Sequence, residues 1–176
     1  MILPMFVKTL MIAGLLSVCS NPVFAGPLED GQEAYEARDY KSAVQFYKQA
    51  ADQGYAIAQH RLGIMYFNGQ GVVQSDAHAI EMFHKAADQK LSDAQYYLGT
   101  LYKVGRGVEK SKQRAAELLR EAADQDHPAA QFSLASLYFY GQGVPQSKDV
   151  ALIWLKKAAA LGDLSARAKL KQFGIE

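Results

Sequence analysis

Residues 58–72 read AQHRLGIMYFNGQGV, and the pattern returns 36 residues later as AQYYLGTLYKVGRGV and once more as AQFSLASLYFYGQGV. The copies keep the same apolar residues in the same places, as Leu62, Leu98 and Leu134 illustrate. A fixed period of roughly 20 to 50 residues is typical of solenoids, in which each unit buries its apolar face against the next. The sequence therefore predicts stacked repeats, and such stacks usually present an extended binding surface.

Each repeat is expected to contain two helices. Apolar residues recur at helical spacing over 56–68, and the glycines that follow can end a helix in the left-handed conformation. Ser75, Ser111 and Ser147 come next at equal spacing, where their hydroxyls can cap a second helix. The predicted fold class is all-α: a solenoid of stacked antiparallel helix pairs.

The order Ala-Gln-x-x-Leu-Gly-x-x-Tyr-x-x-Gly-x-Gly-Val that starts at Ala58 resembles the Sel1-like repeat, a relative of the tetratricopeptide repeat. The resemblance covers three full copies, at 55–90, 91–126 and 127–162, with Ala135 in place of the glycine in the third. It implies a right-handed superhelix of helix pairs. It also implies an adaptor, scaffold or regulatory role, as in bacterial envelope proteins that assemble complexes or neutralise toxins.

The two ends depart from this pattern, as the ends of a stack should. Segment 26–54 is predicted to be an N-terminal capping hairpin, similar to a tetratricopeptide hairpin, because its helices are joined by a shorter loop. Segment 163–176 is predicted to be a C-terminal capping helix, with Leu170 and Phe173 continuing the apolar face.

The first 25 residues have the composition of a secretory leader. Lys8 is followed by an apolar run of about ten residues and by a small-residue end at Ala25. We therefore predict a signal peptide over 1–25, cleaved after Ala25, and a periplasmic or secreted protein with no membrane span after cleavage. Two alternatives are an uncleaved membrane anchor and a lipoprotein modified at Cys19.

The charge is close to balanced, with 19 Lys and Arg against 18 Asp and Glu. A nucleic-acid-binding domain would carry a basic excess, so no nucleic-acid partner is expected. The balance is uneven along the chain: residues 26–60 hold six acids and three bases, whereas 148–176 hold three acids and six bases. Such an asymmetry can orient a charged partner.

One face of the first helix in each pair is a candidate binding surface. Positions 60, 64 and 67 point roughly opposite to the core positions 58, 62 and 65. Because the equivalent helix lines the concave side in similar superhelices, we predict that a protein or peptide binds there, held by aromatic side chains. The alternative is that these rings pack against neighbouring helices. This predicted strip comprises His60, Ile64, Phe67, Tyr96, Thr100, Lys103, Phe132, Ser136 and Phe139.

Nothing in the sequence has the spacing of a catalytic, metal or cofactor site. His60, His78, His84 and His127 do not form a ligand cluster, and the Gly-x-Gly turns lack the context of a phosphate loop. We expect a non-enzymatic protein whose partner is an effector toxin or an envelope complex. One alternative is an immunity protein that neutralises a secreted toxin such as a phospholipase, and a less favoured one is a cell-wall or β-lactam hydrolase.

Overall fold

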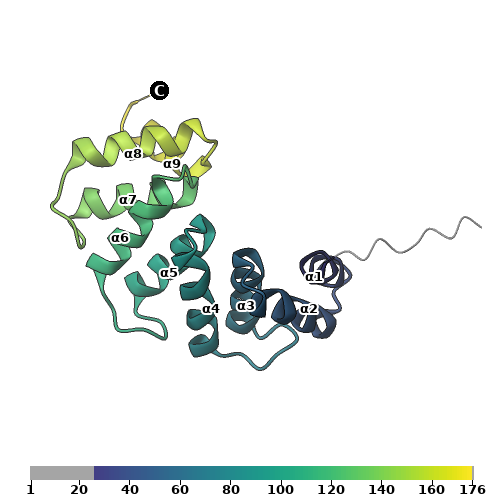
Figure 1. Cartoon of the computed structure of the whole chain (residues 1–176). Coiled ribbons are helices and arrows are strands. Elements are labelled where there is room, and N and C mark those ends of the chain that lie inside the picture. The colour runs from purple at the N-terminus through teal and green to yellow at the C-terminus, as the bar shows by residue number, and fades with distance from the viewer. Residues whose placement is uncertain (1–25, 176) are drawn as a thin grey trace, which may run out of the picture.

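The computed structural model of the protein describes residues 26–175, and over that span it consists of helices and the loops that join them. Figure 1 shows the helix pairs following one another along a curved row. The solenoid predicted from the sequence is therefore confirmed, whereas the predicted leader and Cys19 lie outside the described residues. In chain order the helices are α1 (Pro27–Glu36), α2 (Tyr40–Asp52), α3 (Ala56–Asn68), α4 (Asp76–Asp88), α5 (Ser92–Val104), α6 (Lys112–Ala123), α7 (Pro128–Tyr140), α8 (Lys148–Ala160) and α9 (Leu164–Gln172).

Serine and glycine set the helix boundaries as the sequence predicted. The hydroxyls of Ser75, Ser111 and Ser147 each accept a hydrogen bond from the backbone N–H three residues later, at the start of α4, α6 and α8. Gly69 and Gly105 end α3 and α5 with φ of 68° and 80°, a left-handed conformation that other residues resist.

A small residue in the first helix of each pair lets the second helix come close. A methyl group added at Gly63 would lie 2.7 Å from the Phe83 ring, and one at Gly99 would lie 3.0 Å from Leu119 Cγ. The third copy has Ala135 at this position. The two helices of a pair therefore pack with the side chain of one against the backbone of the other.

The second glycine of each Gly-x-Gly loop joins one helix pair to the pair before it. Gly143 has φ of 73°, and a methyl group there would overlap the carbonyl oxygen of Lys112, at the start of α6. Gly71 stands in the same relation to the carbonyl oxygen of Tyr40, at the start of α2. These two loops thus lie directly on the first turn of the preceding pair's second helix. At Gly107, in the loop between them, the nearest atoms are instead side-chain atoms of Ile80 and Asp76 in α4.

Replacing one of these glycines by alanine distinguishes the energetic cost of steric overlap from the cost of a left-handed backbone conformation. Gly143→Ala is expected to lower the free energy of unfolding by about 3 kcal/mol or more, because left-handed strain and a backbone overlap act together. Gly162→Ala is the matched control, since φ is 94° there and nothing lies within 4 Å. It should cost only about 1 to 2 kcal/mol. Equal shifts of the two urea midpoints would contradict the proposed loop contact.

The core runs along the stack as three connected clusters of buried side chains. The first surrounds Tyr47, the second surrounds Phe83, and the third surrounds Leu119 and Trp154. The expectation that Phe173 continues the core face is corrected, because its side chain is 39% exposed. In residues 26–175, none of the helices combines the length and the apolar character needed to cross a membrane.

A buried glutamine in the first helix of a pair is hydrogen-bonded to a second glutamine at the end of the pair's second helix. Gln89 Nε2 donates to Gln59 Oε1 at 2.8 Å, and Gln125 Nε2 donates to Gln95 Oε1 at 2.7 Å. In each case a residue at the end of one pair's second helix reaches back to the first helix of that pair. The bonds satisfy polar atoms that would otherwise be buried without a partner.

The equivalent glutamine bond is missing from the last pair, α7 and α8. Gln131 is fully buried, and its Oε1 has no partner in the part of the chain that the structure describes. The donor should come from position 161, which is 36 residues after Gln125, but that residue is Leu161. Leu161→Gln is therefore expected to raise the free energy of unfolding by about 1 kcal/mol, measured in urea. Leu161→Glu has the same length and no N–H donor, so an equal gain in that variant would contradict the explanation.

Candidate functional site

The predicted strip lies on α3, α5 and α7, where most of its side chains are half-buried. Ile64 and Phe67 pack against the cluster around Phe83, while Tyr96 and Phe132 pack against the cluster around Leu119 and Trp154. These side chains thus contact the core and keep part of their surface open to solvent. Their role in binding stays a prediction.

His60 differs from the rest of the strip because it is only 6% exposed. Its ring centroid lies 5.8 Å from that of Phe83 and 5.3 Å from that of Tyr97, and its Nε2 has no hydrogen-bond partner among the described residues. Burial lowers the pKa of His60 to about 4, although nearby Asp93 opposes the shift. His60 is therefore a neutral core residue with almost no surface to offer a partner.

Burial of His60 predicts a pH-dependent stability. Its pKa is about 4 when folded and 6.5 in the reference state, so the unfolded chain takes up the proton first as pH falls. The contribution is complete above about pH 6.5 and is lost progressively toward pH 4, by up to about 3 kcal/mol. His60→Phe should remove this part of the dependence in urea titrations at several pH values. His78→Phe, at an exposed position, is the control, and unchanged pH dependence in His60→Phe would contradict the assignment.

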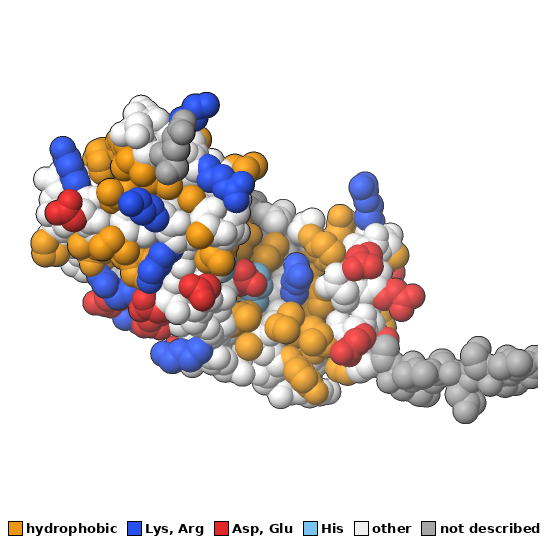
Figure 2. Space-filling model, turned by 90° about the horizontal axis from the view of Figure 1, so that it is seen from above, with side chains coloured by type: hydrophobic (Ala, Val, Ile, Leu, Met, Phe, Trp, Pro, Cys, Tyr) orange, Lys and Arg blue, Asp and Glu red, His pale blue; other side chains and the backbone are white. Residues whose placement is uncertain are grey.

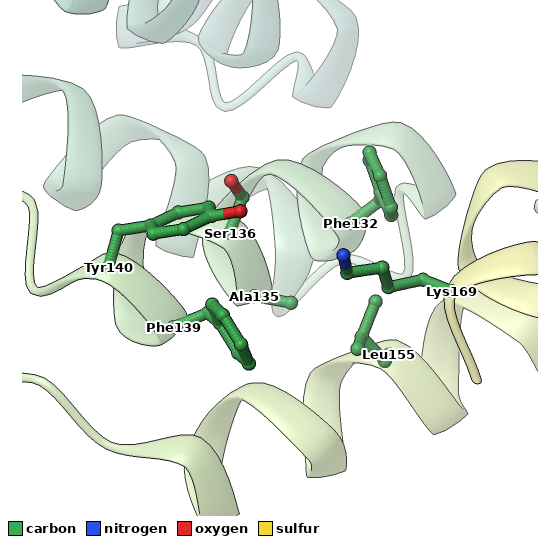
Figure 3. A pocket seen from close by; sticks show the side chains of 7 residues that line it. All are labelled: Phe132, Ala135, Ser136, Phe139, Tyr140, Leu155 and Lys169. Carbon is green, nitrogen blue, oxygen red and sulfur yellow. The ribbon is translucent and has the colours of Figure 1, made fainter. Parts of the chain in front are cut away.

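Between α7 and α9 the strip opens into a hollow of about 160 Å³. Figure 3 shows Lys169 reaching from α9 into the space between Phe132 and Leu155, with Phe139 on the other side of Ala135. Three members of the predicted strip therefore converge on one site. The lining residues are Phe132, Ala135, Ser136, Phe139, Tyr140, Leu155 and Lys169.

The 36-residue register explains why this space is open. At the corresponding place between α3 and α5, Phe83 and Tyr97 stack with centroids 5.4 Å apart. Two periods later the same positions hold Leu155 and Lys169. An aliphatic side chain and a flexible lysine replace two stacked rings, so the floor stays apolar while the space above it is not filled.

Cations lie over two rings of the strip. The Arg106 guanidinium is 3.7 Å from the centroid of Phe67, and it donates two hydrogen bonds, of 2.9 and 2.8 Å, to the Asp76 carboxylate. These bonds lower the pKa of Asp76. Lys148 and Lys169 lie 5.9 and 5.7 Å from the centroid of Phe139. Phe67 is thus covered by a paired arginine, whereas Phe139 is flanked by two lysines.

Sequence reasoning missed these cations because it considered only one face of one helix in each pair. Arg106 comes from the loop after α5, and Lys169 comes from α9. Lys169 was nevertheless detectable, because subtracting two periods places it at Tyr97, next to the strip position of Tyr96. The cation expected from the strip itself was Lys103.

Tyr96 is fixed by a contact between α5 and α7. Its ring stacks on His127, with centroids 4.8 Å apart. His127 Nδ1 accepts from the Ala130 N–H and so caps α7, which leaves the proton on Nε2, 3.2 Å from Asp93 Oδ1. The tautomer of His127 therefore follows from its hydrogen bonds, and the middle of the strip is held rigid.

The arrangement suits non-covalent binding. In residues 26–175 no three His, Cys, Asp or Glu side chains are placed to hold a metal ion. Ser75, Ser111 and Ser147 are engaged as helix caps. The hollow offers apolar contact area, aromatic rings and a lysine, which are groups that recognise peptides and protein surfaces.

A family model described as Sel1 repeat matches residues 26–55, 56–91, 92–127 and 128–163. The chain belongs to the Sel1 repeat family. The first match covers the segment that the sequence analysis assigned to a tetratricopeptide-like capping hairpin. Sel1-repeat proteins are generally scaffolds for protein–protein interaction and generally not enzymes.

Solved structures support the same assignment. A Sel1 repeat protein from Oxalobacter formigenes is 32% identical with a TM-score of 0.79, and the match covers 85% of this chain and 63% of that one. The protective antigen c5321 of uropathogenic Escherichia coli is 33% identical, also with a TM-score of 0.79, over 85% of this chain and 33% of that one. This chain therefore spans less than two thirds of either protein.

A more distant structure shares the fold alone. The immunity protein Pa5087 from Pseudomonas aeruginosa is 21% identical with a TM-score of 0.57, over 85% of this chain and 62% of that one. No curated protein sequence matches the chain.

Proposed function

We propose that this chain is an exported, periplasmic interaction protein that holds a segment of a partner protein along α3, α5 and α7. The observation that carries the proposal is the hollow between α7 and α9, where Phe132, Phe139 and Tyr140 line an open space. Partly open rings on a rigid scaffold are frequent anchors at interfaces, because little conformational entropy is lost when they bind. Membership of the Sel1 repeat family and the predicted leader over 1–25 support the proposal.

Affinity capture from an envelope extract tests the hollow. A variant with Phe132→Ala and Tyr140→Ala should reduce recovery of the partner by about tenfold or more, since the loss of anchoring rings costs at least about 1.4 kcal/mol. The control combines Tyr55→Ala with Ile57→Ala, both about half exposed and outside the hollow. Both variants are first checked for helicity and melting temperature. Equal recovery by the two folded variants would contradict the proposal.

Location is tested separately from binding. The full chain is produced in a bacterium, and intact mass is measured on the protein in the periplasmic fraction. We expect a mature chain that begins at Gly26, as the small-residue end before it predicts. A lipid-modified chain that begins at Cys19, or retention in the cytoplasmic fraction, would contradict this part of the proposal.

A narrower form of the proposal is an immunity role, in which the partner in the groove is a secreted toxin such as a phospholipase. The fold shared with an immunity protein of Pseudomonas aeruginosa is compatible with that role. The test is inhibition of a purified toxin encoded beside this chain. Protection of cells that is lost in the Phe132→Ala, Tyr140→Ala variant would support immunity, and absence of inhibition would leave the general interaction role.

A further inference from the structure

Within residues 26–175, no ion pair neutralises the lysines at the C-terminal end of the solenoid. Every ion pair recorded within residues 26–175 lies between Asp76 and His127. Lys148, Lys157 and Lys169 instead lie over aromatic rings. On the face drawn in Figure 2, most Lys and Arg side chains lie on the lobe away from the grey trace, and acidic side chains lie on both lobes. Such a surface attracts anionic groups.

Lys169 brings this charge into the hollow. Its Nζ lies 5.7 Å from the centroid of Phe139 and 5.0 Å from that of Phe173. One of its three N–H donors is directed to Gln172 Oε1, 3.0 Å away. Since an ammonium group has three donors, two are left for an acceptor that enters the hollow. The site therefore combines an apolar floor with a cationic group above it.

A second hollow of about 250 Å³ lies on the other side of Phe139 and shares Leu155 with the first. Lys148 and Asp149 both line this second hollow, so its charges oppose each other. An anionic group is therefore favoured at Lys169, in the first hollow, and an uncharged apolar side chain is favoured in the second.

We propose that the hollow between α7 and α9 binds an acidic segment of a partner protein in which a carboxylate lies next to an aromatic or long aliphatic side chain. The apolar side chain enters between Phe132 and Phe139 and rests on Leu155. The carboxylate accepts hydrogen bonds from Lys169 Nζ. Charge-assisted bonds of this kind are stronger than neutral ones, and they are stronger again beside an apolar floor. This inference rests on the proposed function and specifies its partner.

A second copy of the chain is a poorer occupant. If a second copy continued the stack, one of its helices would pack against α9. The contact would fall at the position that Gly63, Gly99 and Ala135 occupy in α3, α5 and α7, where the second helix of each pair approaches closely. The residue at that position in α9 is Lys171, which is exposed. A long charged side chain there opposes the close approach that the other pairs require.

The test uses three fluorescent nine-residue peptides and the purified chain without its predicted leader, which lies outside the described fold. The first peptide has a central Phe with two Glu on each side, the second replaces Phe by Ser, and the third replaces each Glu by Lys. Anisotropy titrations at low salt should show the first peptide binding about tenfold more tightly than either of the others. Equal affinities would overturn the inference.

Variants locate the binding. Lys169→Glu should weaken the first peptide about tenfold or more, and Lys169→Met should weaken it less, because it keeps the apolar stem and loses only the charge. Lys171→Glu makes the same charge change on the same helix and should leave the affinity within about twofold. Melting temperatures confirm that the variants are folded. An equal effect of Lys169→Glu and Lys171→Glu would overturn the inference, since it would reflect net charge alone.

The other occupants are also measured. Binding to anionic lipid vesicles that depends on Lys169 and is not displaced by the first peptide would overturn the inference. Self-association in sedimentation that is abolished by Lys169→Glu, with no peptide binding, would do the same. If the captured partner depends on Phe132 and Tyr140 but not on Lys169, the proposed function stands and this inference fails. If capture of the partner depends on none of Phe132, Tyr140 and Lys169, both the proposed function and this inference fail.

Discussion

The solenoid depends on a contact between backbones. Gly71 and Gly143 place their Cα atoms where any side chain would meet a carbonyl oxygen of the preceding pair, with the loop in a left-handed conformation. This contact fixes the distance and rotation between neighbouring pairs, whereas the apolar clusters only require that neighbours be close. The middle loop differs, because the atoms nearest to a methyl group at Gly107 would be side-chain atoms of Ile80 and Asp76, so the backbone contact is made by the first and third Gly-x-Gly loops.

Side-chain identity distinguishes equivalent places along the stack. Between α3 and α5 the positions around His60 are filled by mutually stacked rings. Between α7 and α9 the same positions hold Leu155 and Lys169, and a hollow results. The candidate site therefore lies where an aliphatic and a flexible side chain replace two stacked rings.

The sequence predicted local structure well because the signals for it are local. Ser75 caps α4 and Gly69 ends α3 through bonds within a few residues, so spacing along the chain was sufficient. The environment of His60 was not predictable in this way, since its burial depends on Phe83 and Tyr97 from two other helices. The position of Lys169 could be read from the repeat register, but not its place over Phe139, which depends on the packing of α9.

Lys171 distinguishes α9 from the corresponding helices α3, α5 and α7. Gly63, Gly99 and Ala135 let the second helix of their pairs approach closely, whereas the equivalent residue of α9 has a long, exposed cationic side chain. A helix packed on α9 at the distance seen in the other pairs would have to displace that side chain or take its charge out of water, and burying an unpaired charge is costly. This face of α9 is thus suited to contact with water and not to close helix packing.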